Sequence, residues 1–171
     1  MRSLHLLKIE RIEQVNADGK VVWAKENLLN VLHTAGEQYM LEAAFVGGPT
    51  ANEFIPDNFW FGLDDRTSLL AADTQSDLLN EPSVNGYARQ SIASKDGFVV
   101  ALSGGINKGS APIVTFSTAG GTWGPVSQLF MATTQNTSGI LIASIGLGSS
   151  VTVPADDSIN VRMSISLTDT V

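Results

Sequence analysis

Residues that could carry out acid–base or nucleophilic chemistry are sparse in this sequence. Nucleophilic catalysis needs a base beside the nucleophile, and the chain has two histidines, His5 and His33. His5 lies in a predicted N-terminal strand and His33 directly before a predicted helix. We interpret both as interfacial or solvent-facing imidazoles. From Gly109 to Ala155 the chain has no Asp, Glu, Lys, Arg or His. The side chains of that long stretch therefore supply no general acid, base or hard metal ligand.

Four aspartates form the densest carboxylate group of the chain, and Ca²⁺ prefers oxygen ligands. They are Asp64, Asp65, Asp73 and Asp77. Their spacing lacks the Asp-x-Asp-x-Asp-Gly pattern of a calcium loop, so we interpret them as turn and cap residues. Asp156-Asp157 after Pro154 likewise predicts a turn. The chain has no cysteine for a zinc site or a disulfide. We expect no catalytic, cofactor-binding or metal-binding residues, no cofactor and no enzymatic activity.

Two glycine-rich segments and three tryptophans are the remaining candidates for ligand binding. Ser103-Gly104-Gly105 and Ala119-Gly120-Gly121 lack the Gly-Lys-Ser/Thr ending of a phosphate loop, so we predict hairpin loops there. Trp23, Trp60 and Trp123 could together form a surface that stacks on sugars. Trp60 lies in an apolar run that favours the core. Trp123, at a glycine-rich loop, is the one candidate kept for a carbohydrate site.

Charge and composition limit the classes of partner. The 171 residues suit one domain with a substantial core. Charged residues make up 16% of the chain and the net charge is −7, with no cluster of Lys and Arg, so we expect no nucleic-acid partner. We find no export signal, and the longest weakly polar stretch, Ile140 to Leu147, is too short to span a bilayer. We expect synthesis in the cytoplasm and no membrane partner.

The elements that must position these residues are mostly strands. Leu6–Val15 and Lys20–Ala24 flank the turn sequence Asn16-Ala17-Asp18-Gly19 and predict a hairpin. Thr34 and Glu37 suggest a capping box, followed at helical spacing by Leu41, Ala44 and Phe45 until Gly47-Gly48. Asp73 is the predicted N-cap of a second, shorter helix that ends before Glu81-Pro82.

From Phe59 onward, short apolar runs separated by Gly, Pro, Asn and Ser predict an antiparallel sandwich. The alternation is clearest in the last strand, where Ile159, Val161 and Met163 share one face. The predicted strands are residues 59–63, 88–92, 98–103, 113–117, 126–133, 140–145 and 159–167. The expected fold is an all-β antiparallel β-sandwich with an N-terminal hairpin arm and one short helix. We divide the chain into 1–30 (hairpin arm), 31–57 (helix and linker) and 58–171 (sandwich).

Several sequence segments resemble those of small virion proteins of tailed bacteriophages. The resemblance begins at Asn58-Phe59-Trp60-Phe61-Gly62-Leu63 and extends over residues 58–167. Its other segments are Asp73-Thr74, Glu81-Pro82, Gly86-Tyr87-Ala88-Arg89-Gln90, Gly120-Gly121-Thr122-Trp123-Gly124-Pro125-Val126, Leu129-Phe130, Gly139-Ile140-Leu141-Ile142-Ala143 and Asp157-Ser158-Ile159. The resemblance implies a jelly-roll-like sandwich, a non-enzymatic structural role and a place in the virion. It carries no catalytic role onto any residue.

Within that class, we favour a capsid decoration protein on the outside of the head, because the chain is short and lacks a coiled-coil stalk or a glycine-repeat shaft. The alternatives are a tail or neck component and a host-glycan-binding module. The expected partners are the major capsid protein or other virion subunits. The charge-free region 109–155 also suggests a homo-oligomer, with a trimer favoured because shell decoration commonly uses three-fold positions.

The N-terminal hairpin has two alternative roles. An isolated two-stranded hairpin is marginally stable, so its apolar residues must pack on something. Leu7, Ile9 and Ile12 are among them. In the first alternative the hairpin is a docking arm that adds its edge to a neighbour's sheet. In the second it packs on its own sandwich. Truncation of residues 1–25 separates the two.

Overall fold

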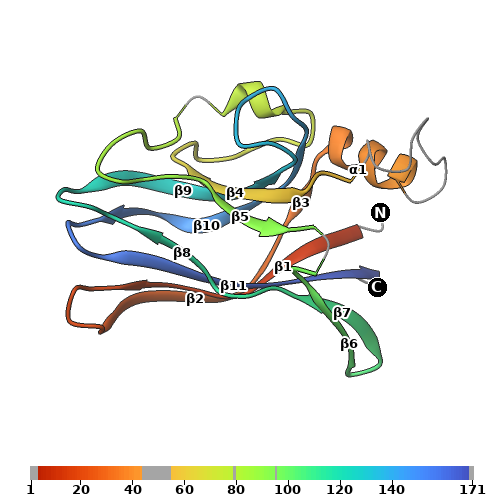
Figure 1. Cartoon of the computed structure of the whole chain (residues 1–171), viewed down its shortest axis with the longest axis horizontal. Helices are drawn as coiled ribbons and strands as arrows, with labels where there is room; N and C mark the ends of the chain where they lie inside the picture. Colours follow the sequence, from red (N-terminus) through yellow and green to blue (C-terminus); the bar gives the residue numbers. More distant parts are fainter. Residues whose placement is uncertain (1–3, 44–54, 79, 95, 170–171) are drawn as a thin grey trace.

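Two antiparallel sheets pack face to face in the computed structural model of the chain (Figure 1). The structure describes residues 4–43, 55–78, 80–94 and 96–169. The expected β-sandwich with one short helix is therefore confirmed. We name the two layers the β1 sheet and the β9 sheet, each after one of its central strands.

The β1 sheet has six strands, in the order β2-β1-β11-β7-β6, with β8 also paired to β11. Its strands are β1 (Leu4–Val15), β2 (Val21–Leu29), β6 (Val99–Ser103), β7 (Ile106–Ser110), β8 (Val114–Ser117) and β11 (Ser158–Asp169). β7 and β8 share one edge of β11, facing residues 164–165 and 158–161 respectively. Pro112 lies between them and has no backbone N–H to donate, which fits the interruption of the ladder there.

The β9 sheet has five strands, in the order β3-β10-β9-β4-β5. Its strands are β3 (Val31–Leu32), β4 (Asn58–Asp64), β5 (Gln90–Ala93), β9 (Trp123–Ala132) and β10 (Leu141–Val153). The helix α1 (Thr34–Leu41) follows β3 and packs on β10, where Gly36 meets the Ile142 backbone. A Cβ at position 36 would lie 2.6 Å from the Ile142 Cα, so glycine permits this close approach.

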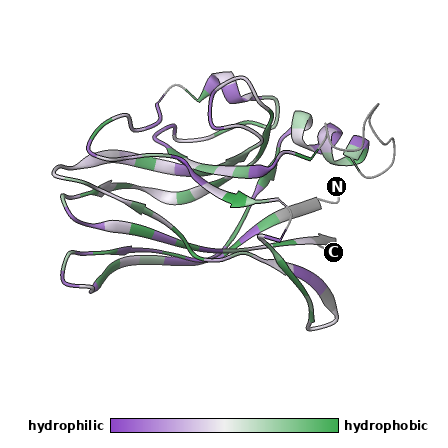
Figure 2. Cartoon of the chain, viewed as in Figure 1, coloured by the Kyte–Doolittle hydropathy of each residue, from purple (hydrophilic) through white to green (hydrophobic). Residues whose placement is uncertain are grey.

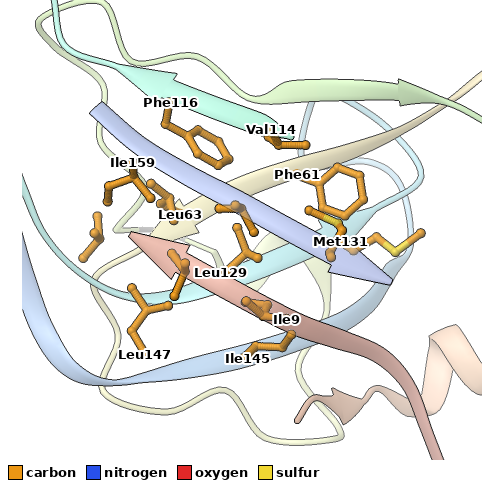
Figure 3. Close-up of a cluster of buried hydrophobic side chains, with 14 of the residues drawn as sticks. Ile9, Phe61, Leu63, Val114, Phe116, Leu129, Met131, Ile145, Leu147 and Ile159 are labelled. Carbon is orange, nitrogen blue, oxygen red and sulfur yellow. The ribbon is translucent and has the colours of Figure 1, made fainter. Parts of the chain in front are cut away.

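The core fills the space between the sheets. Side chains from β1, β8 and β11 meet side chains from β4, β9 and β10, and those of Ile9, Leu63, Phe116 and Leu129 point toward one another (Figure 3). Hydrophobic and hydrophilic stretches alternate along the strands, as expected of strands with one buried face (Figure 2). A second, smaller cluster lies on the other face of β9 and joins Phe130 and Ala132 to the loop residues Leu69 and Leu78.

The N-terminal hairpin packs on its own sandwich, which is the second of the two alternatives. β1 pairs with β11 from Leu4↔Asp169 to Val15↔Ser158 and with β2 on its other side. Leu7, Ile9 and Ile12 are fully buried in the main core. β1 is thus an interior strand. The boundaries at residues 30 and 57 remain a prediction.

The helix starts differ from the sequence expectation by one residue each. α1 has His33 as its N-cap, without a side-chain cap hydrogen bond, so the capping box predicted from Thr34 and Glu37 is wrong. The second helix is a single 3₁₀ turn, η2 (Gln75–Asp77), capped by Thr74 and not by Asp73. Ala44, Phe45 and Gly47-Gly48, the predicted end of α1, lie outside the described residues.

Most predicted strands are present, and the differences concern their ends. β3 and β7 lie outside the predicted strands, and β10 continues through residues 146–150, beyond the predicted strand end at residue 145. Register shifts in β10 between Gly146 and Val153 show that this part of the strand is irregular. Ser103-Gly104-Gly105 lies in the β6–β7 hairpin, as predicted. Ala119-Gly120-Gly121 is not in a hairpin, because it connects β8 in one sheet to β9 in the other.

Candidate interaction surface

The His33 side chain is occupied in a structural contact. His33 is fully buried, so its interpretation as an interfacial or solvent-facing imidazole is wrong. Its Nε2 lies 2.9 Å from the Ser144 hydroxyl, and burial lowers the pKa of its imidazole below 6.5. Ser144 is itself buried, so this histidine–hydroxyl pair has no exposed nucleophile. For His5 the structure gives a backbone pairing with Thr168.

Three of the four aspartates of the 64–77 segment, Asp64, Asp73 and Asp77, hold turns together. The Asp64 carboxylate is fully buried and accepts hydrogen bonds from the backbone N–H groups of Arg66 at 2.9 Å and Asn80 at 3.3 Å. Burial raises the pKa of Asp64 above 3.8. Asp73 accepts from the Leu70 N–H at 2.7 Å, and Asp77 accepts from the Thr74 N–H at 2.8 Å. Within the described ranges no three His, Cys, Asp or Glu side chains group as around a metal ion.

A buried polar network joins the loops on the outer side of the β9 sheet. Arg89, with its side chain 5% exposed, donates from Nε and Nη2 to both carboxylate oxygens of Glu81 at 2.8–3.0 Å. Its Nη1 donates to the carbonyl oxygens of Thr134 and Asn136, and its guanidinium lies 4.8 Å from the Phe130 ring centre. The network therefore fastens the 133–140 loop to the segment that precedes β5.

Tyr87 extends this network toward the core. Its hydroxyl donates to Glu81 at 2.7 Å and accepts from the Leu63 N–H at 2.7 Å. Its ring stacks on Phe116 and meets Trp123 edge to face. Burial beside the Glu81 carboxylate raises the pKa of Tyr87 well above 10. No sequence pattern predicted this network, although Glu81, Tyr87 and Arg89 all lie in the segments that carry the resemblance to virion proteins.

The tryptophans do not form a sugar-stacking platform. Trp123 is 2% exposed and part of the main core, so its selection as a carbohydrate candidate is wrong. Trp23 packs partly buried against the same core. Trp60 is half-buried on β4, opposite Ala132 of β9. A polar hollow of about 420 Å³ beside β9 and β10 has only uncharged side chains, among them Gln128, Ser149 and Ser150.

The surfaces that offer contacts to other molecules are apolar residues on edge strands. β2 is one outer edge of the β1 sheet, with Val22 53% exposed. β6 is the other, and Val99, Val100 and Leu102 are each 70–71% exposed. The β6–β7 hairpin projects from the body of the sandwich (Figure 1). We call residues 99–110 the β6–β7 ribbon. The sequence does not indicate its exposure, because Val99-Val100-Ala101-Leu102 has no polar alternation and is typical of a buried strand.

An apolar groove lies at the base of this ribbon. Phe98, Val100, Gly109 and Ile165 line it, in a hollow of about 280 Å³. Phe98 packs against the main core and meets Phe59 edge to face, with ring centres 6.4 Å apart. The groove is therefore continuous with the packed interior. In the described parts of the chain, no helix is long and apolar enough to cross a membrane.

Comparison with known proteins adds a family to this geometry. The family described as podophage GP4 fiber I protein gp80 matches residues 33–167. The chain belongs to this family. The match covers α1 and the strands from β4 to β10, together with most of β11, and it leaves the β1–β2 hairpin outside. It therefore includes α1, which the resemblance over residues 58–167 did not. No curated protein and no solved structure matches the chain.

Membership of the fibre family confirms a phage virion structural component, with other virion subunits as partners. It corrects the favoured placement on the capsid. The family is described by a fibre protein. The match therefore supports the alternative of a tail component and does not support decoration of the head. The sequence lacks a stalk, yet the chain belongs to a family described by a fibre protein, so the missing stalk does not separate decoration from fibre proteins.

Proposed function

We propose that this chain is a non-enzymatic structural subunit of the tail-fibre apparatus, held there by contacts with other fibre subunits. The observation that carries the proposal is the match of the fibre family across residues 33–167, which spans most of the sandwich. The chemistry of the interior agrees with it. His33, Asp64 and Arg89 are buried in contacts that hold turns and loops, and a group with its bonding capacity used in this way is poorly placed to turn over a substrate.

The proposal includes self-association. Exposed apolar side chains on β2 and β6 are better covered by protein than by water. The sequence-based prediction of a trimer rested on the three-fold positions that shell decoration commonly uses. With head decoration unsupported, that basis for a trimer no longer applies, and the exposed edges of β2 and β6 are what limit the number of copies.

Co-sedimentation tests the placement. The purified chain is mixed separately with isolated tails that lack this protein and with empty heads, and each mixture is spun through a density cushion. We expect the chain to pellet with tails and to stay in solution with heads. Pelleting with heads alone would overturn the fibre proposal, and so would pelleting with neither particle.

A further inference from the structure

The outer edge of β6 lacks the features that normally protect an exposed strand. Native sheets protect their edges with very short strands, charged side chains or bulges. β3, β5 and β8 have no more than four residues each. β2 carries Lys25 and Glu26, and Asn27 has a positive φ of 57°. β6 reads Val-Val-Ala-Leu-Ser, and among the described strands none pairs with it on the side away from β7.

Backbone geometry leaves the hydrogen-bonding groups of two β6 residues directed outward. The ribbon turns through two glycines, with Ser103 opposite Ile106 as the closing pair. Hydrogen-bonded and non-hydrogen-bonded pairs alternate along an antiparallel ladder from such a closing pair. Ala101 and Lys108 therefore bond to each other, whereas Val100 and Leu102 direct their N–H and C=O groups away from β7.

The side chains at these two positions are also uncovered. Val100 and Leu102 lie on the same face of the ribbon, since alternate residues share a face, and each is 71% exposed. This face is the one that continues into the apolar groove, because Val100 and Asn107 both line it. An occupant must therefore supply both an antiparallel strand edge and apolar side chains at matching positions.

We propose that two copies of this chain associate by antiparallel pairing of their β6 edges about a two-fold axis at Ala101. In this register Val100 of each copy faces Leu102 of the other, so the two outward-directed residues form hydrogen-bonded pairs with apolar cross-strand contacts. Ala101 faces its own counterpart, where a small side chain permits close approach. The two six-stranded sheets become one continuous sheet across the dimer.

Charge favours a second copy as the occupant at this edge. The chain carries a net charge of −7, so contact between two copies brings like charges together over most of the surface. Between residues 97 and 155 it has no acidic residue, and Lys108 is the one charged side chain. Across the proposed register the two Lys108 residues stand three strand spacings apart, roughly 14 Å. That exceeds the Debye length of about 8 Å at physiological salt, so their repulsion is screened.

The first experiment measures mass by light scattering after size exclusion, over a range of concentrations. We expect the wild-type chain to reach twice 18.1 kDa. Val100→Lys places a charge on the exposed edge and is expected to give a monomer with an unchanged circular dichroism spectrum. Val22→Lys on the opposite edge is the matched control and is expected to remain dimeric. A monomeric or trimeric wild type, or a Val100→Lys protein as dimeric as the wild type, would overturn the proposal.

The second experiment fixes the register with single cysteines, which the cysteine-free chain makes unambiguous. Ala101→Cys faces itself at a non-hydrogen-bonded pair, where Cα atoms lie about 4.5 Å apart and a disulfide can close. We expect this variant to cross-link under mild oxidation. Val99→Cys is displaced from its counterpart by four residues, roughly 13 Å, and should not. Val22→Cys on β2 should not cross-link either. Equal cross-linking of the three variants, or none at position 101, contradicts the two-fold pairing.

This pairing does not depend on where in the virion the chain sits. Failure of the light-scattering and cysteine experiments would leave the placement in the tail-fibre apparatus standing, and binding to heads would leave the β6 pairing standing.

Discussion

Arg89 is the residue on which the order of the outer loops depends most. It is the described charged side chain that combines a two-point bond to a carboxylate, bonds to two loop carbonyl oxygens and contact with an aromatic ring. Such a residue cannot be recognised from sequence, because Glu81, Phe130 and Asn136 are brought to it by three different segments. The composition does indicate that buried charges are few, because 43% of the residues are apolar and 16% are charged.

We predict that Arg89→Ala lowers the free energy of unfolding by about 3–5 kcal/mol, because it leaves the Glu81 carboxylate partly buried without its partner. Urea unfolding followed by tryptophan fluorescence measures the change. Arg11→Ala is the control, since Arg11 also contacts two carboxylates but its side chain is 39% exposed. Its stability should stay close to that of the wild type. An equal decrease in the free energy of unfolding for the two variants would show that the buried network contributes no more to stability than the exposed ion pairs of Arg11.

His33 makes a prediction about pH. Burial lowers the pKa of its imidazole below 6.5, so in the unfolded chain it binds a proton at a higher pH than in the folded one. Its stabilising contribution is therefore complete above pH 6.5 and is lost as the pH falls toward the folded-state pKa, at up to about 1.4 kcal/mol per pH unit.

The measurement uses a His5→Gln background, in which His33 is the remaining histidine. We expect the urea concentration at the unfolding midpoint of this variant to decrease as the pH is lowered from 7 to 5. His33→Gln added to it should flatten that slope while the hydroxyl of Ser144 keeps a partner. A slope unaffected by the second substitution would mean that the pKa of His33 is the same in the folded and the unfolded chain.

At the scale of elements, alternation and turn residues predicted most strands, and local patterns failed where a neighbour decides the structure. The final strand was recognised because odd-numbered residues from Ile159 to Met163 are all buried. β3 and the C-terminal part of β10 were missed because they have no strand pattern of their own. They are strands only through pairing with another segment. The N-cap of α1 was misplaced because His33 is held by its bond to Ser144, 111 residues away.

The N-terminal hairpin gives a prediction at this scale. Because β1 lies between β2 and β11 and buries Leu7, Ile9 and Ile12, a chain lacking residues 1–25 should fail to fold. Circular dichroism and one-dimensional NMR would show loss of the β signal and of dispersed methyl resonances. A folded truncated protein would mean that the hairpin is dispensable, as the arm alternative supposed. Ile9→Ala, expected to cost about 2–5 kcal/mol, gives a graded version of the same test.

For the whole molecule, composition indicated a structural β protein. Its place in the virion could be assigned only from the family match. A sandwich body suits capsid decoration and fibre subunits equally, because both need a rigid core and a surface for neighbours. The exposed edge of β6 could not be predicted from the sequence either. Val99 to Leu102 reads like a buried strand, and only the three-dimensional arrangement leaves it exposed at an edge.

Immunogold electron microscopy of intact virions would locate the chain in the particle. Antibodies raised against the purified chain are applied to particles and to particles of a mutant phage that lacks the gene. We expect gold on the fibres at the tail, none over the head surface, and none on the mutant particles. Gold distributed over the head would contradict the fibre assignment and restore capsid decoration.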